Sequence, residues 1–195
     1  MSISKLAITM IFAVAAAACG SDSGSKSGEL DIDAGVDPVP PIVEPTCLVD
    51  KNLGAPTLQG QKGPTEIPTQ QGNIPATFVG ALLNQDPTPD VLQITFAHIG
   101  SWETGVITEG THSFSQDTPV IAGVFADANL QTGEAVAVYS ASQTSGTYTV
   151  TSVEPVLSVT LNNVLFQETD AQGAAIENGC EFTLNGITVN GTAAQ

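Results

Sequence analysis

The chain has 195 residues and a formal net charge of −16, because 20 acidic side chains face only four basic ones. The basic residues all lie in the first third of the chain, at Lys5, Lys26, Lys51 and Lys62. Binding to a phosphate backbone or to an anionic lipid surface requires clustered Lys or Arg, so this composition excludes a nucleic-acid partner and a purely electrostatic membrane contact.

The N-terminal segment has the form of an export signal. Lys5 precedes an apolar run from Leu6 to Ala18, which is too short to span a bilayer as a stable anchor. The end of this run, Ala16-Ala17-Ala18-Cys19, resembles the lipobox of bacterial lipoproteins, with Ala16 at the position where Leu is usual. An ordinary secretory signal is the alternative, since Ala16 and Ala18 also suit that cleavage.

The lipoprotein resemblance implies a cellular location for the protein. Residues 1–18 would be a signal peptide, and Cys19 would carry acyl chains after cleavage. The protein would then be exported to the bacterial cell envelope and anchored to the outer membrane, on its periplasmic face or at the cell surface. The protein would bind its membrane partner through the acyl chains on Cys19. Several acyl chains together hold a protein firmly at a membrane.

Residues 19–45 follow as a tether. They are rich in Ser, Gly and Asp at first and in Pro later, without a usable periodicity, which is typical of a disordered linker. The remaining residues, 46–195, are enough for a single domain with its own hydrophobic core.

Cysteine usage predicts one disulfide. If Cys19 is acylated, Cys47 and Cys180 remain as an even pair in an oxidising compartment. A bridge between them would close a loop of more than a hundred residues. In the chain-entropy model such a loop contributes about 4–5 kcal/mol to stability. Two separate buried thiols are the alternative.

The middle of the chain contains several predicted strands. Thr46–Pro75 is rich in Gly, Pro, Gln and Thr and is expected to be mostly loop with a short strand or two. Runs of apolar and β-branched residues then predict strands at Thr77–Leu83, Val91–His98, Thr111–Ser115, Val120–Ala126 and Ala135–Ser140. A helix over Val120–Leu130 is the alternative for one of them, although Gly123 disfavours it.

The last fifty residues carry the clearest pattern. Apolar side chains alternate with polar ones from Gly146 to Thr192, and the alternation switches parity at Asn162-Asn163 and at Asn185-Gly186. Such a switch requires a bulge or a tight turn, and we favour paired bulges in neighbouring strands. The whole pattern predicts an all-β domain, an antiparallel β-sandwich or barrel of about seven to eight strands.

Candidate metal ligands are few and have structural alternatives. His98 and His112 could form a metal site with Glu103, Glu109 or Asp117, but no zinc-binding spacing is present, and a strand-end histidine bonded to the backbone is the default. No cofactor is expected, although two acidic loops offer oxygen ligands that could bind calcium. These candidate ligands are Asp127, Asn129 and Glu134 in one loop, and Glu168 and Asp170 in the other. Ordinary turn geometry explains the same residues.

The functional expectation is a binding or structural domain without catalytic residues. No G-x-S-x-G motif occurs, and acylation with disulfide formation leaves no free thiol. We expect a non-enzymatic envelope lipoprotein with an unidentified protein or glycan partner. A calcium- or carbohydrate-binding module, with Trp102 as the weak carbohydrate-contacting candidate, is the alternative, and a hydrolase is the third. Exposed aromatic residues on one face or a concave sheet would favour binding, and a polar surface without a pocket would favour a structural role. Two carboxylates, or His98 and His112, converging in a cleft would favour an enzyme.

Overall fold

A computed structural model describes residues 46–50, 53–69, 71–99, 106–114, 120–142 and 145–193. The predicted signal peptide, Cys19, the tether and Trp102 lie outside these residues. The described residues contain strands and no helix, which confirms the all-β fold class. The strands are β1 (Thr57–Thr69), β2 (Gly72–Leu82), β3 (Val91–Ala97), β4 (Gly110–Ser113), β5 (Val120–Ala126), β6 (Ala137–Ala141), β7 (Thr147–Ser152), β8 (Val156–Asn162), β9 (Val164–Thr169), β10 (Glu181–Leu184) and β11 (Ile187–Ala193). None of the elements in the described ranges is a helix with the length and apolar character needed to cross a membrane.

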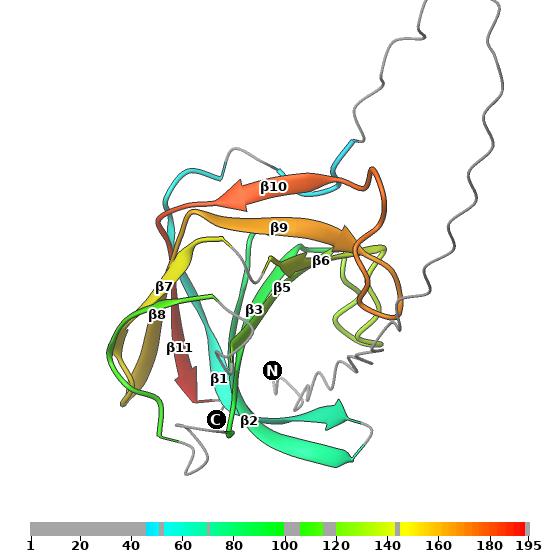
Figure 1. The fold of residues 1–195 in the computed structure, drawn as a ribbon. Helices are drawn as coiled ribbons and strands as arrows, with labels where there is room; N and C mark the ends of the chain where they lie inside the picture. The colour runs from blue at the N-terminus through cyan, green and yellow to red at the C-terminus, as the bar shows by residue number, and fades with distance from the viewer. Residues whose placement is uncertain are drawn as a thin grey trace, which may run out of the picture.

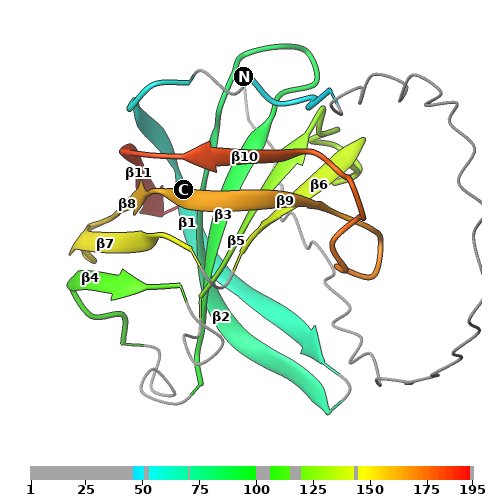
Figure 2. The same ribbon diagram turned by 45° about the horizontal axis from the view of Figure 1, so that its top comes forward.

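The strands form one strongly curled sheet, a half-barrel, in which the β1–β2 hairpin projects from the rest (Figures 1 and 2). Neighbouring strands in the described residues are antiparallel except β1 and β11, which are parallel. The expectation of a purely antiparallel sheet was therefore wrong at this pair, because alternation predicts which face is buried but not which strand lies alongside. From one edge to the other the order is β10, β9, β6, β5, β3, β2, β1, β11, β8, β7 and β4.

The number of strands exceeds the seven or eight expected, mainly because β1 and the start of β2 form in a segment predicted to be mostly loop. Residues 57–62 of β1 pair with β11 and residues 61–69 pair with β2, so residues 63–69 pair with β2 alone. Pro64 and Pro68 lie in this second part, where one edge of the strand has no partner strand. Proline is tolerated at such an edge because no ladder hydrogen bond is lost.

The two parity switches form one shared corner in the sheet. Leu161 lies opposite Ile187 on one side of the corner, and Val164 lies opposite Leu184 on the other, so the register is the same on both sides. The predicted paired bulges, each within a continuous strand, were wrong, because both strands end at this level. Instead both strands break at the same level, and β8 and β11 continue as β9 and β10 on another side of the half-barrel (Figure 1).

The corner lets one continuous core form inside the curl. The inward side chains on both sides of it, including Leu161, Val164, Leu184 and Ile187, are at most 2% exposed and belong to the same cluster. The predicted disulfide joins Cys47 to Cys180, whose Cα atoms are 5.3 Å apart. It ties the segment that enters the domain to the residue before β10.

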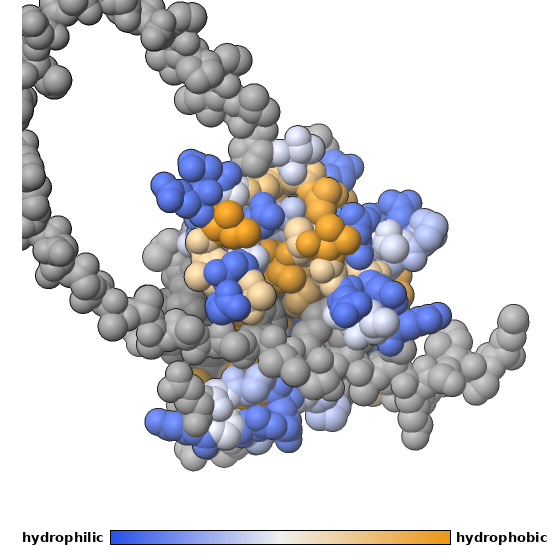
Figure 3. All heavy atoms as spheres, turned by 90° about the vertical axis from the view of Figure 1, so that its right-hand side faces the viewer, coloured by the Kyte–Doolittle hydropathy of each residue, from blue (hydrophilic) through white to orange (hydrophobic). Residues whose placement is uncertain are grey.

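The outer surface is not uniformly polar. On the face at the right of Figure 1, apolar side chains gather between charged and polar ones (Figure 3). Exposed apolar residues of the described part include Val106, Val136 and Ile176. Single exposed apolar side chains are normal on a soluble domain, so these residues alone do not define a site.

Candidate functional site

Described residues line a cavity of about 400 Å³ that opens to solvent. Strands β1, β2, β8 and β11 contribute to its wall, together with the β7–β8 loop and the segment before β4. We call it the Lys62 cavity. Its polar lining comes from Lys62, Thr77 and Glu154, and much of its apolar lining from Pro64, Ile107 and Leu157.

Strand register explains why a lysine lies inside the curl. Lys62 is opposite Val79, and Pro64 is opposite Thr77. Side chains of opposed residues lie on the same face of a sheet. Since Val79 is fully buried in the core, Lys62 and Thr77 must also be on the inner face.

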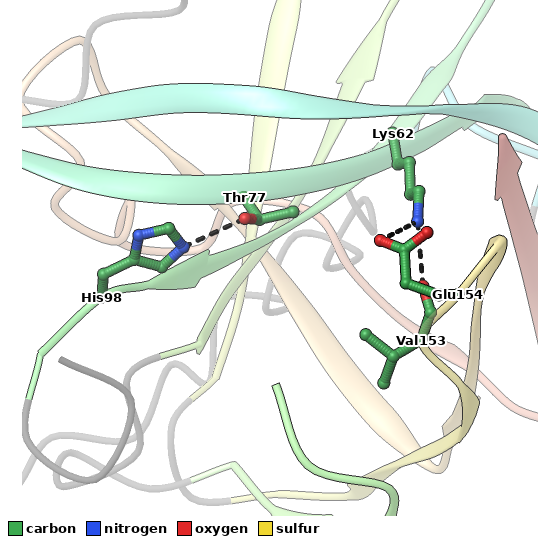
Figure 4. A network of polar contacts seen from close by, with 5 residues as sticks. All are labelled: Lys62, Thr77, His98, Val153 and Glu154. Atoms are coloured by element: carbon green, nitrogen blue, oxygen red, sulfur yellow. Dashed lines mark hydrogen bonds and ion pairs between the residues drawn. The ribbon is translucent and has the colours of Figure 1, made fainter. Parts of the chain in front are cut away.

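Lys62 is held by two contacts from the β7–β8 loop (Figure 4). Its Nζ donates a hydrogen bond of 2.9 Å to the carbonyl oxygen of Val153 and lies 2.7 Å from Oε1 of Glu154. The two members of this ion pair differ sharply in exposure, at 10% for the Lys62 side chain and 77% for Glu154. Lys62 is also the only basic residue in the described ranges. The cavity therefore holds the sole positive charge of the described domain.

The two histidines have separate partners. His98, just after β3, has its Nε2 3.0 Å from the hydroxyl of Thr77 (Figure 4), a residue that lines the Lys62 cavity. His112, on β4, stacks on Tyr148 and has its Nε2 3.2 Å from the carbonyl oxygen of Thr108. Among the described residues no group of three His, Cys, Asp or Glu side chains is placed to hold a metal ion. Glu109, another suggested ligand, lies in the described part and joins no such group, whereas Glu103 and Asp117 lie outside those ranges.

The first predicted calcium loop uses its oxygens within the turn. Oδ1 of Asn129 accepts hydrogen bonds from the amides of Gln131 and Thr132. The hydroxyl of Thr132 in turn donates to Glu134. Asp127 instead accepts from the Thr88 hydroxyl. These contacts are the turn chemistry that was the alternative to calcium binding.

The second predicted loop is similar. Oδ1 of Asp170 accepts hydrogen bonds from the amides of Gln172 and Ala174. Oε2 of Glu168 accepts from the amide of Cys180. Glu168 and Asp170 thus shape the β9–β10 loop and position the half-cystine at its end.

A buried carboxylate, Asp90, was missed by sequence reasoning. It is 4% exposed, and its carboxylate accepts hydrogen bonds from the Asp127 amide and the Asn84 side chain. Burial raises the pKa of Asp90, and the hydrogen bond from Asp127 opposes that shift. The sequence pattern does indicate this burial, because Asp90 falls on the same alternate positions as Leu92 and Ile94, which are fully buried. Asp90 does not line the Lys62 cavity, so it is a structural carboxylate of the β2–β3 turn.

The Lys62 cavity was also missed, because Lys62 lies in a segment predicted as loop and Glu154 in an ordinary hairpin connection. The cavity has the size and the mixed lining of a small-molecule site, with apolar walls and a few polar groups. Such an arrangement can bind and orient a small ligand. No protein-family model matches the chain, and neither a curated protein nor a solved structure matches it.

Proposed function

We propose that this protein is an exported, acyl-anchored lipoprotein whose β-domain binds a small, partly apolar ligand without chemical turnover. The lipobox-like Ala16-Ala17-Ala18-Cys19 supports the anchor. A tether of residues 19–45 would give the domain a typical reach of roughly 30 Å from the membrane if it behaves as a flexible chain. The binding role rests on the domain itself.

The Lys62 cavity is the observation that carries the binding role. A concave sheet with a cavity of about 400 Å³ favours a binding module over a purely structural one. The described residues of its lining include one carboxylate, that of Glu154, and neither histidine. A hydrolase would need a pair of carboxylates or a base beside a nucleophile in this space. Binding is therefore the function best supported by the lining.

The anchor is tested in the full-length protein by replacing the candidate acylated residue. The unaltered protein should fractionate with membranes, and the Cys19→Ser variant should be released into the soluble fraction. If the variant stays with the membranes, the lipobox interpretation is wrong.

The cavity is tested with the detergent-free, full-length Cys19→Ser protein and the neutral fluorescent probe N-phenyl-1-naphthylamine. We expect a saturable rise in probe fluorescence. Ala193→Trp should abolish the rise, because Ala193 lines the cavity near the end of β11. Thr192→Trp is the matched control, since the adjacent residue of a strand points to the opposite face. Equal probe binding by the two tryptophan variants would contradict the proposed function.

A further inference from the structure

We infer that the Lys62 cavity selects a small apolar monocarboxylate, whose carboxylate replaces that of Glu154 on the ammonium group of Lys62. This inference rests on the proposed binding function and names the ligand class for that same cavity. It follows from the unequal exposure of the two charges and from the apolar walls around them.

The Lys62 ammonium needs a negative partner at all times. Its side chain is only 10% exposed, and its neutral contact is the carbonyl oxygen of Val153. A buried charge that loses its counter-ion is strongly unfavourable, because neither water nor another charge then stabilises it. A ligand that displaces Glu154 must therefore bring a negative charge of its own.

Glu154 can be displaced at little cost. It lies in the three-residue connection between β7 and β8, and its side chain is 77% exposed. A carboxylate with this exposure is already largely hydrated, so Glu154 itself gains little from the pair. Exchange of one carboxylate for another leaves the charge at Lys62 balanced, while released Glu154 turns to solvent.

The body of the ligand would supply most of the net affinity. Pro64, Ile107 and Leu157 present apolar surface in the same cavity. Burial of a methylene group against such surface improves affinity by about fourfold. A saturated chain or a small ring system joined to the carboxylate would fit this lining.

The charge of the domain restricts the ligand to one negative charge. From residue 63 to the C-terminus the chain has thirteen acidic residues and no basic one. This negative field disfavours a dianion such as a phosphate monoester. A cationic ligand could pair only with Glu154, and would leave Lys62 without its partner.

Three ligands that share one ten-carbon chain test this inference: decanoate, decan-1-ol and decylammonium. Each is titrated by calorimetry into the full-length Cys19→Ser protein. Decanoate should bind about tenfold more tightly than decan-1-ol, as a charge-assisted hydrogen bond would give, and decylammonium should bind most weakly. Lys62→Met should reduce decanoate affinity to that of the alcohol, with alcohol affinity unchanged within about twofold.

The control variant Lys26→Met removes the same charge from the predicted tether and should leave all three affinities unchanged. Equal affinities for decanoate and decan-1-ol, both blocked by Ala193→Trp, would overturn the carboxylate preference and leave the proposed binding function standing. Tighter binding of decylammonium would also overturn the preference. If no ligand binds and N-phenyl-1-naphthylamine also fails to bind, both this inference and the proposed function are wrong.

Discussion

The side-chain oxygen of Asn185 accepts a hydrogen bond of 3.2 Å from the backbone amide of Asn163, which joins the two strand breaks at the corner of the sheet. Asn163 has a positive φ of 52°, a conformation that asparagine tolerates better than most residues. Beside this contact, the amide of Gly186 donates to the carbonyl oxygen of Leu161. The corner is therefore closed by hydrogen bonds in both directions.

Removal of the Asn185 side chain should weaken this corner. Asn185→Ala leaves the Asn163 amide without its acceptor, and we expect the free energy of unfolding to fall by about 1 kcal/mol. Asn190→Ala is the matched control, because it removes the same type of side chain from β11. The Asn190 side chain makes no hydrogen bond to any of the described residues. Urea unfolding followed by circular dichroism measures both, and equal losses would argue against a specific role for the corner.

Two buried tyrosines should respond in opposite directions to loss of their hydroxyl groups. Tyr139 is 1% exposed and its hydroxyl accepts a hydrogen bond from the Leu48 amide, whereas no described residue bonds the hydroxyl of fully buried Tyr148. Burial raises the pKa of Tyr148, so this hydroxyl stays neutral. Tyr139→Phe should lower the free energy of unfolding by about 1 kcal/mol, and Tyr148→Phe should raise it by a similar amount. A shift of the same sign in both variants, measured by urea unfolding, would contradict this assignment.

The stability of the domain should depend on pH through Asp90. Burial raises the pKa of this carboxyl above its ordinary value of 3.8, so the folded state holds the proton more tightly than the unfolded state. The resulting stabilisation is complete below the unfolded-state pKa and is lost as the pH rises through the folded-state pKa. Asp90→Asn should therefore become more stable relative to the unaltered protein as the pH increases.

Urea unfolding between about pH 4 and about pH 7 measures this difference. Glu177→Gln, which neutralises an exposed carboxylate of the β9–β10 loop, is the control and should show no such trend. If Asp90→Asn instead becomes less stable relative to the unaltered protein as the pH rises, the burial argument is contradicted.

Sequence patterns predicted which residues form most of the core, but not how the strands turn at the corner to enclose it. Val120–Ala126 forms a strand with the predicted bounds, and the alternating residues around Leu157 and Phe182 are buried as expected. The position of each parity switch was also predicted. Whether a switch is a bulge or a corner depends on which residue lies opposite, and one strand's sequence contains no information about its partner's register.

The candidate site was less predictable, because its charges come from distant parts of the chain. Lys62 and Val153 are 91 residues apart in sequence, and β1 contains two Gly and two Pro, residue types that are depleted in strands. Only the register of β1 with β2 places Lys62 on the inner face. In contrast, His98 and the acidic loops were easy to single out by residue type, yet their polar atoms serve local hydrogen bonds.

The most direct test of exchange at Lys62 is the dissociation constant of decanoate for the Glu154→Gln variant, compared with the unaltered cavity in the same Cys19→Ser background. Glutamine keeps the shape of the side chain but removes the internal carboxylate that competes for Lys62. We predict binding about three- to fivefold tighter, which corresponds to the removal of a competing, largely exposed carboxylate worth up to about 1 kcal/mol. Unchanged or weaker binding of decanoate would contradict the exchange.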